Sequence, residues 1–162
     1  SYYAITKAAS TMLCTYAARR ERAHVVTLRL YSVYGPWENP GRLIPELVVE
    51  GFRGRLPPLV RPATARDFVY VDDAVDACLR AAVRPGPEPG AVYNVGTGVQ
   101  TTVRQVVAQI RRIMAIPERP TWGSMEARHW DTDCWIADAS SWLNRSGHAI
   151  SAPSLSAARF AS

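Results

Sequence analysis

The chain has 162 residues, of which 48% are hydrophobic and 20% are charged, a balance typical of one globular domain rather than a disordered segment. No apolar run is long enough to cross a membrane, and no secretory signal is visible, so we expect a cytoplasmic protein. Three scattered cysteines, Cys14, Cys78 and Cys134, exclude a disulfide framework and a paired-cysteine zinc site.

The net charge of +5 comes from nineteen basic and fourteen acidic residues, and Lys7 is the single lysine among the bases. This excess fits three explanations: nucleic-acid binding, binding of small anionic ligands, or a general preference for arginine with solvated charges. No nucleic-acid-binding motif accompanies the charge, so we expect no nucleic acid partner. The other two explanations stay open.

Helix-like and strand-like segments alternate along the chain. The spacing of apolar residues predicts helices over 3–20, 43–52 and 74–83, a fourth that ends at 114, and shorter ones at 139–145 and 154–160. Apolar and β-branched runs predict strands over 25–31, 68–71, 92–95 and 134–137. Asp72 or Asp73 is expected to cap the third helix, and Thr101 or Thr102 the fourth. The alternation predicts the α/β class.

The predicted strands are too few for a complete doubly wound sheet. The chain also begins at Ser1 rather than at methionine, and it enters a helix at once. We therefore expect the sequence to be a fragment or a processed product, with part of the sheet upstream of it.

The first motif is Tyr3-x-x-x-Lys7, whose spacing places both side chains on one face of a helix. An ammonium group near a phenol favours the phenolate, which lets a tyrosine act as a general acid or base. The alternative is a helical tyrosine and lysine that lie near each other without a function.

Three further segments follow in order. Residues 29–36 form a strand that ends at Gly35-Pro36, and ligand sites in open α/β sheets lie just past such strand ends. Within 65–73, Arg66 can bind a phosphate through two hydrogen bonds or form a surface ion pair of little consequence. Residues 93–98 end in Gly-Thr-Gly, which permits a tight turn but is not the glycine-rich fingerprint of dinucleotide-binding proteins.

Taken in this order, the four segments resemble the C-terminal part of the extended short-chain dehydrogenase/reductases, the NAD-dependent epimerases and dehydratases that act on nucleotide sugars. The resemblance covers residues 3–155. It implies an α/β fold made of an incomplete Rossmann-like, doubly wound sheet and a smaller mixed α/β substrate-binding domain. Residues 1–36 would belong to the NAD(P)-binding Rossmann domain and 37–162 mostly to the nucleotide-sugar-binding domain, with 66–98 returning in part to the Rossmann sheet.

The resemblance assigns Tyr3 the role of catalytic acid or base, which exchanges a proton with a sugar hydroxyl or ketone. Lys7 would be its catalytic partner and would hold the nicotinamide ribose of the cofactor, NAD or NADP. Tyr34, Gly35 and Pro36 would line the end of the cofactor site. The glycine-rich phosphate loop, which lies far upstream in relatives, is absent from this sequence, so the half that binds the dinucleotide is missing.

On the substrate side, the resemblance implies contacts with a nucleotide diphosphate sugar. The residues implied are Ser32, Arg42, Leu43, Arg66 and Arg128. Arg66 and Arg128 would bind the diphosphate, whereas Ser32 stands where many relatives carry asparagine. No residue is expected to bind a metal ion.

We therefore expect an NAD(P)-dependent nucleotide-sugar epimerase or dehydratase that oxidises the sugar transiently by hydride transfer. The alternative is a truncated or non-catalytic remnant that binds a nucleotide sugar and lacks the cofactor-binding half. The isolated 162-residue chain is expected to be inactive. We also expect a homodimer formed through the Tyr-x-x-x-Lys helix, and an edge of strand 25–31 that makes the isolated chain aggregate or need a partner.

Overall fold

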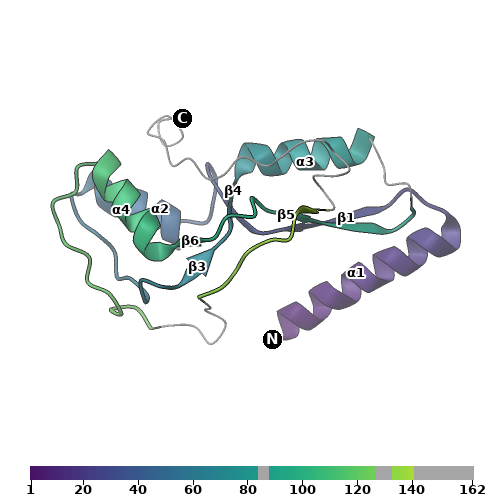
Figure 1. Ribbon diagram of the computed structural model, residues 1–162, viewed down its shortest axis with the longest axis horizontal. Coiled ribbons are helices and arrows are strands. Elements are labelled where there is room, and N and C mark those ends of the chain that lie inside the picture. Colours follow the sequence, from purple (N-terminus) through teal and green to yellow (C-terminus); the bar gives the residue numbers. More distant parts are fainter. Residues whose placement is uncertain (84–87, 127–132, 141–162) are drawn as a thin grey trace.

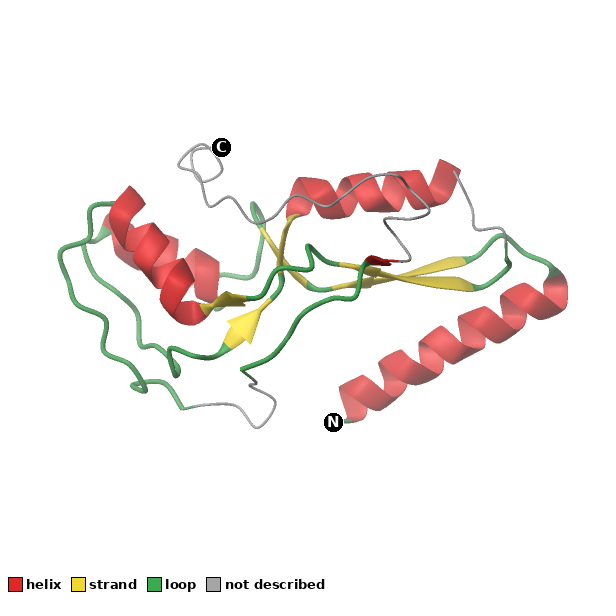
Figure 2. Ribbon diagram, viewed as in Figure 1, coloured by secondary structure: helices red, strands yellow, loops and turns green. Residues whose placement is uncertain are grey.

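The computed structural model describes residues 1–83, 88–126 and 133–140. Its helices are α1 (Tyr2–Glu21), α2 (Leu43–Phe52), α3 (Val71–Val83) and α4 (Val103–Ile113). Its strands are β1 (Val26–Leu30), β2 (Ser32–Tyr34), β3 (Ala65–Arg66), β4 (Phe68–Tyr70), β5 (Ala91–Val95) and β6 (Thr101–Thr102). Figures 1 and 2 show these elements, which form the mixed α/β fold that the alternation predicts.

Two parallel strand pairs make up the centre of the molecule. β1 pairs with β5 over all five of its residues, and β2 pairs with β4. Only Tyr31 separates β1 from β2, so one extended segment changes its partner there. Tyr31 N donates to Val95 O (3.1 Å), and Ser32 N donates to Asp67 O (3.0 Å). This segment therefore joins the two strand pairs.

Helices cover the strand pairs in a layered arrangement. Figure 1 shows α1 and α3 on opposite sides of the β1–β5 pair, and α2 beside α4 at the other end of the molecule. The short strands β3 and β6 form an antiparallel pair next to α4. Parallel strands that are linked through helices are the arrangement on which Rossmann-type sheets are built.

The hydrophobic core consists of two clusters that share β4. The first joins α2 and α4, and its most deeply buried side chains are Leu47, Leu59, Val106, Val107 and Ile110. The second lies between α3 and the β1–β5 pair. Phe68 and Tyr70 belong to the first cluster and Val69 to the second, because successive side chains of a strand point to opposite faces. β4 is therefore buried on both faces, as its continuous apolar sequence indicates.

The two predicted helix caps have different outcomes. Thr102 is the N-cap of α4, where its side chain accepts from Gln105 N and the Gln105 side chain bonds back to the cap backbone. The predicted cap of α3 is wrong, because β4 leads straight into a helix that begins at Val71. Asp72 and Asp73 lie inside its first turn, where their negative charges interact favourably with the positive end of the helix dipole.

Some predicted elements differ from the structure. Residues 134–137 form no strand; side chains from other segments hold this stretch instead. The two-residue strands β3 and β6 were not predicted, because their sequences are too short to show a period. The predicted helix at 154–160, most of 139–145 and part of the loop at 85–90 lie outside the described residues.

Candidate functional site

Tyr3 and Lys7 lie on one face of α1, near its first turn. The Ser1 hydroxyl begins this helix by accepting from Ala4 N (3.3 Å). Lys7 Nζ lies 5.8 Å from the centroid of the Tyr3 ring, within the range of a cation–π contact. The Tyr3 side chain is 70% exposed, so its hydroxyl is open to a ligand. The side-chain contacts of this pair within the described residues stay inside α1.

The turn after β2 contains the residues predicted to line the cofactor site. Tyr34 is only 2% exposed, and its ring packs edge-on against Tyr70 with centroids 5.5 Å apart. Gly35 has a φ of +143°, and a Cβ there would lie 2.6 Å from Cγ1 of Val71. Only glycine fits this position without strain. The structure thus places Tyr34 in the core and Gly35 at a close backbone approach, with Pro36 exposed.

The start of α2 holds Arg42 and Leu43. Arg42 Nε forms an ion pair with Glu38 Oε1 at 2.8 Å, and more than half of the arginine side chain is exposed. Burial raises the pKa of Glu38, and the charge and hydrogen bond of Arg42 oppose that rise only in part. Leu43 packs against the first core cluster. Arg42 is therefore the one of the two whose side chain can reach a ligand.

Arg66 lies at the end of β3 and stacks on an aromatic ring. Its Cζ atom is 5.5 Å from the ring centroid of Trp135, and its Nη1 donates to Ala65 O at 2.7 Å. The Trp135 ring in turn meets the edge of Tyr31, with centroids 6.3 Å apart. Arg66 is half-buried. The guanidinium is therefore held against a surface instead of moving freely in solvent.

Asp67 is a fully buried carboxylate to which the sequence motifs assign no role. Oδ1 accepts from Thr97 N (2.9 Å) and from Thr97 Oγ1 (2.6 Å). Oδ2 accepts from Gly98 N (3.0 Å) and from Ala137 N (3.0 Å). An acidic residue between two apolar strand segments was the only available signal, because its partners lie far away in the sequence.

The structure brings together only some of the residues that are predicted to bind the substrate. Ser32 is half-buried and donates its N–H to Asp67 O, so it lies beside the turn that carries Arg66. Arg128 lies outside the described residues. The structure thus groups Ser32, Arg66 and Trp135 at one end of the two strand pairs.

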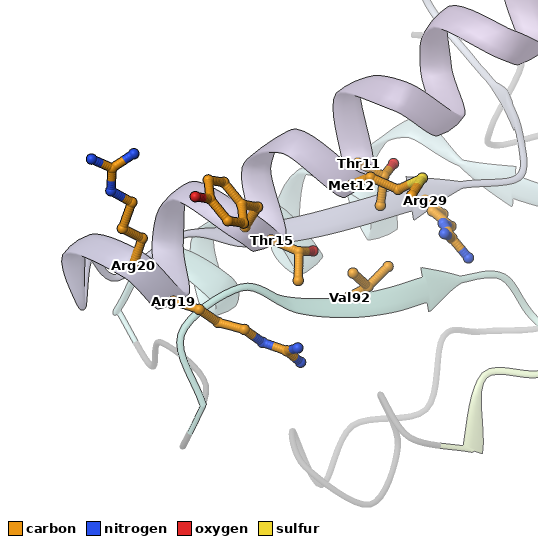
Figure 3. Close-up of a pocket in the computed structure, with 8 residues that line it drawn as sticks. Thr11, Met12, Thr15, Arg19, Arg20, Arg29 and Val92 are labelled. Carbon is orange, nitrogen blue, oxygen red and sulfur yellow. The ribbon is translucent and has the colours of Figure 1, made fainter.

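A separate groove lies between α1 and the β1–β5 pair. Figure 3 shows lining side chains that come from the helix, from β1 (Arg29) and from β5 (Val92). Its volume is about 680 Å³, and the residues that line it are Thr11, Met12, Thr15, Tyr16, Arg19, Arg20, Arg29 and Val92. None of the predicted site residues lines this groove.

The described residues contain neither a metal-binding cluster nor a membrane-spanning helix. In the ranges that the structure describes, His, Cys, Asp and Glu residues nowhere gather in a group of three that could hold a metal ion. The described helices include none with the length and apolarity needed to cross a bilayer.

Solved structures of known proteins share this fold. UDP-glucose 4-epimerase of Thermotoga maritima, determined with UDP-glucose, superposes with a TM-score of 0.80 and 28% identity over 95% of this chain and 48% of its own. The dTDP-glucose 4,6-dehydratase of Bacillus anthracis, determined with NAD, gives a TM-score of 0.81 and 24% identity over 93% of this chain and 47% of its own. The fold is therefore of the Rossmann type found in these epimerases and dehydratases.

The sequence comparisons identify the family. The model of the NAD dependent epimerase/dehydratase family matches residues 1–96, which is more than half of the chain. The trifunctional UDP-glucose 4,6-dehydratase/UDP-4-keto-6-deoxy-D-glucose 3,5-epimerase/UDP-4-keto-L-rhamnose-reductase of Arabidopsis thaliana is 32% identical over 112 residues, covering 68% of this chain and 16% of that protein. The chain belongs to the NAD-dependent epimerase/dehydratase family, and it spans about half the length of the solved relatives.

Proposed function

We propose that this chain supplies the catalytic helix and the substrate-binding side of an NAD(P)-dependent nucleotide-sugar epimerase or dehydratase. The observation that carries the proposal is the contact between Tyr3 and Lys7 on an exposed helix face, inside the part of the chain that matches the family. Within the described residues, Lys7 forms no ion pair, so its ammonium charge acts on the phenol and on whatever binds beside it.

Tyr3 is the proposed acid and base of the reaction. Its exposed hydroxyl takes the proton of a sugar hydroxyl as the sugar carbon is oxidised, and it returns a proton when a ketone is reduced. Lys7 stabilises the phenolate form of Tyr3 by its positive charge. The three N–H donors of the ammonium group also suit the hydroxyls of a ribose.

The residues present fit one end of a nicotinamide cofactor. Lys7, whose ammonium group lies beside the exposed Tyr3 ring, would hold the ribose, and the exposed Pro36 would border the end of the cofactor site. When bound, NAD or NADP accepts the hydride from the sugar carbon. The glycine-rich loop that cradles the dinucleotide phosphates is not in this sequence, so these residues could serve only the nicotinamide end.

We assign substrate binding to the part of the molecule that carries Arg66 and Ser32. Arg66 would bind the diphosphate of a nucleotide sugar through its N–H edge, with Ser32 nearby as a hydroxyl donor. Arg128 would be the second diphosphate ligand, and Arg42 and Leu43 would border the sugar. These assignments follow the family motif residue by residue.

The strand pairing supports the proposed domain division. Residues 1–36 carry α1, β1 and β2, which we assign to the Rossmann domain. β4 and β5 lie within 66–98 and pair with β2 and β1, so this stretch returns to the sheet. The rest of 37–162 would belong mostly to the nucleotide-sugar-binding domain. A homodimer through α1 is proposed because this helix exposes large apolar side chains.

The alternative is a nucleotide-sugar-binding remnant without catalysis, and the basic balance of the chain fits it equally well. Turnover separates the two. The 162-residue chain and the natural protein at its full length are each given NAD and a panel of UDP- and dTDP-sugars, and products are separated chromatographically. The proposal predicts epimerised or dehydrated product from the full-length protein. Binding of a nucleotide sugar without any turnover by either protein would favour the remnant.

A further inference from the structure

We propose that Asp67 is a positioning residue that fixes the Arg66 guanidinium for a diphosphate, acting through Trp135. The inference rests on the proposed function of Arg66 as a diphosphate ligand. It assigns a task to a buried carboxylate that the proposed chemistry leaves unexplained.

Several hydrogen-bond donors converge on the carboxylate of Asp67. Four hydrogen bonds reach its two oxygens, two from Thr97, one from Gly98 N and one from Ala137 N. All the partners are donors, which suits a carboxylate because it only accepts. Burying a carboxylate is costly unless such bonds compensate for the lost water. Asp67 is therefore placed to tie the turn after β5 and the 133–138 segment to the end of β3.

Hydrogen bonds from other parts of the chain hold the 133–138 segment at several points along its length. Gln100 Nε2 donates to Asp133 O (2.8 Å), and Asn94 Nδ2 donates to Asp138 O (3.0 Å). Both bonds are exposed to solvent, whereas the bond from Ala137 N to Asp67 is buried. Since buried hydrogen bonds face less competition from water, Asp67 provides the firmest of these anchors.

The hydrogen bond between Ala137 and Asp67 also affects Arg66, because Trp135 lies between them. Trp135 lies two residues before Ala137, so the position of its backbone depends on the Asp67 bond. Its ring supports the guanidinium of Arg66 on one face, at 5.5 Å. Stacking uses the face of a guanidinium, whereas phosphate oxygens bind to the N–H groups at its edge. The Trp135 ring, together with the hydrogen bond from Arg66 Nη1 to Ala65 O, therefore limits where the guanidinium can lie.

Replacement of Asp67 by asparagine tests this chain of contacts at constant size. An asparagine side chain has only one acceptor oxygen. Its NH₂ group would therefore face backbone N–H groups, which are also donors, at the place of the other carboxylate oxygen. One anchor is then lost, either at Thr97 or at Gly98 and Ala137. If the amide keeps its oxygen toward Thr97, the 133–138 segment is released and Trp135 no longer holds Arg66.

The experiment is a double-mutant cycle on binding of UDP, measured by isothermal titration at fixed ionic strength. Wild type, Arg66→Gln, Asp67→Asn and the double variant are compared. We expect Arg66→Gln and Asp67→Asn each to raise the Kd about tenfold or more, as loss of a charged hydrogen bond would. The double variant should bind no more weakly than Arg66→Gln, because Asp67 acts through Arg66.

A destabilised control separates positioning from general damage. Glu50→Gln removes two ion pairs at the end of α2 without touching Arg66 or the Asp67 contacts, so it should bind UDP as wild type does. A second readout needs no ligand: the Nε–H resonance of Arg66 should show a ring-current shift in wild type that Asp67→Asn abolishes. Loss of UDP binding in Glu50→Gln would overturn the inference.

The outcomes distinguish the inference from the function on which it rests. If Arg66→Gln binds UDP as tightly as wild type, the proposed role of Arg66 fails and the inference fails with it. If Arg66→Gln binds weakly while Trp135→Leu binds as wild type, or if the Arg66→Gln and Asp67→Asn effects add, the inference alone fails. Should Asp67→Asn not fold, Trp135→Leu decides, since this side chain is 45% exposed: unchanged UDP affinity would contradict the inference.

Discussion

The buried carboxylate of Asp67 and the main-chain N–H of Ala137, 70 residues apart in the sequence, are joined by a hydrogen bond of 3.0 Å. This bond brings the last described segment of the chain against the turn after β5. Gly96 packs against both Ala137 and Asp67, and these two residues leave no room for a side chain at position 96. The packing around Asp67 can therefore be tested at Gly96 without changing any charge.

Gly96→Ala should destabilise the protein. A Cβ at this position would lie 2.3 Å from Cβ of Ala137 and 2.7 Å from Oδ2 of Asp67. Relief requires the buried contact to open, so we expect a loss of about 1–3 kcal/mol in the free energy of unfolding, measured by urea denaturation. Gly41→Ala is the matched control, because only Asn39 Oδ1 lies near its Cβ, at 3.5 Å. Equal stability of the two variants would contradict the packing described for Asp67.

Gly35→Ala should also destabilise the protein, for two reasons that can be separated. The φ of +143° strains any residue with a Cβ, and that Cβ would lie 2.6 Å from Cγ1 of Val71. We expect a loss of about 2 kcal/mol in the free energy of unfolding. In a Val71→Ala background the same substitution should cost less, since the nearest atom is gone. An unchanged cost in that background would assign the whole effect to the backbone strain.

The ion pairs of Glu50 predict a dependence of stability on pH. Partial burial raises the pKa of Glu50, but the hydrogen bond from Arg53 and the charges of Arg55 and Arg53 together lower it below its ordinary value of 4.5. Arg53 Nη1 lies 2.6 Å from Oε1, and Arg55 Nη2 lies 2.9 Å from Oε2. A carboxyl whose pKa is lowered by folding stabilises the folded state above the pKa of the unfolded chain. That stabilisation is lost as the pH falls through the lower, folded pKa.

The measurement compares the free energy of unfolding of wild type and Glu50→Gln between about pH 3 and pH 7, a range that brackets the ordinary glutamate pKa of 4.5. Wild type should be the more stable at the upper end, and the difference should shrink toward the acid end. Glu46→Gln, which removes a carboxylate from the same helix, is the control. A difference that grows on acidification would contradict the assigned direction of the pKa shift.

The apolar surface of α1 predicts self-association. Leu13 is 66% exposed, and its exposed neighbours on the helix include Tyr2, Ile5, Met12 and Tyr16. Exposed apolar side chains that gather on one element mark an interaction surface, so we expect dimers or larger species in sedimentation velocity. Leu13→Glu should reduce them. Leu79→Glu, which changes a similarly exposed leucine on α3, should leave them unchanged. A wild-type chain that stays monomeric at every concentration would contradict the proposed interface.

Local patterns predicted the main elements of the fold well. Apolar spacing located α1 and α2, and the threonines at 101 and 102 marked the start of α4. The strands β1, β4 and β5 were recognisable from apolar and β-branched runs, although β4 alone of the three is buried at every residue. These features depend on residues that are close together in the sequence, which is why they could be read without a structure.

Contacts between distant residues could not be predicted in this way. Nothing near Asp67 indicates that Thr97 and Ala137 are its partners, and the stacking of Arg66 on Trp135 spans a similar separation. The stretch at 134–137 has the apolar residues of a strand, but Ala137 N donates to the Asp67 side chain, and the Asn94 side chain donates to O of the next residue, Asp138. Tertiary hydrogen bonds therefore replaced the strand pairing that its composition favours.

The proposed role of Tyr3 is tested most directly by comparing Tyr3→Phe with Tyr2→Phe in the natural protein at its full length. The two tyrosines are neighbours on α1 and both are exposed, but only Tyr3 has the ammonium group of Lys7 against its ring. The account predicts that Tyr3→Phe lowers kcat about 100-fold or more with little change in the KM for the nucleotide sugar, whereas Tyr2→Phe behaves as wild type. Equal turnover by the two variants would contradict it.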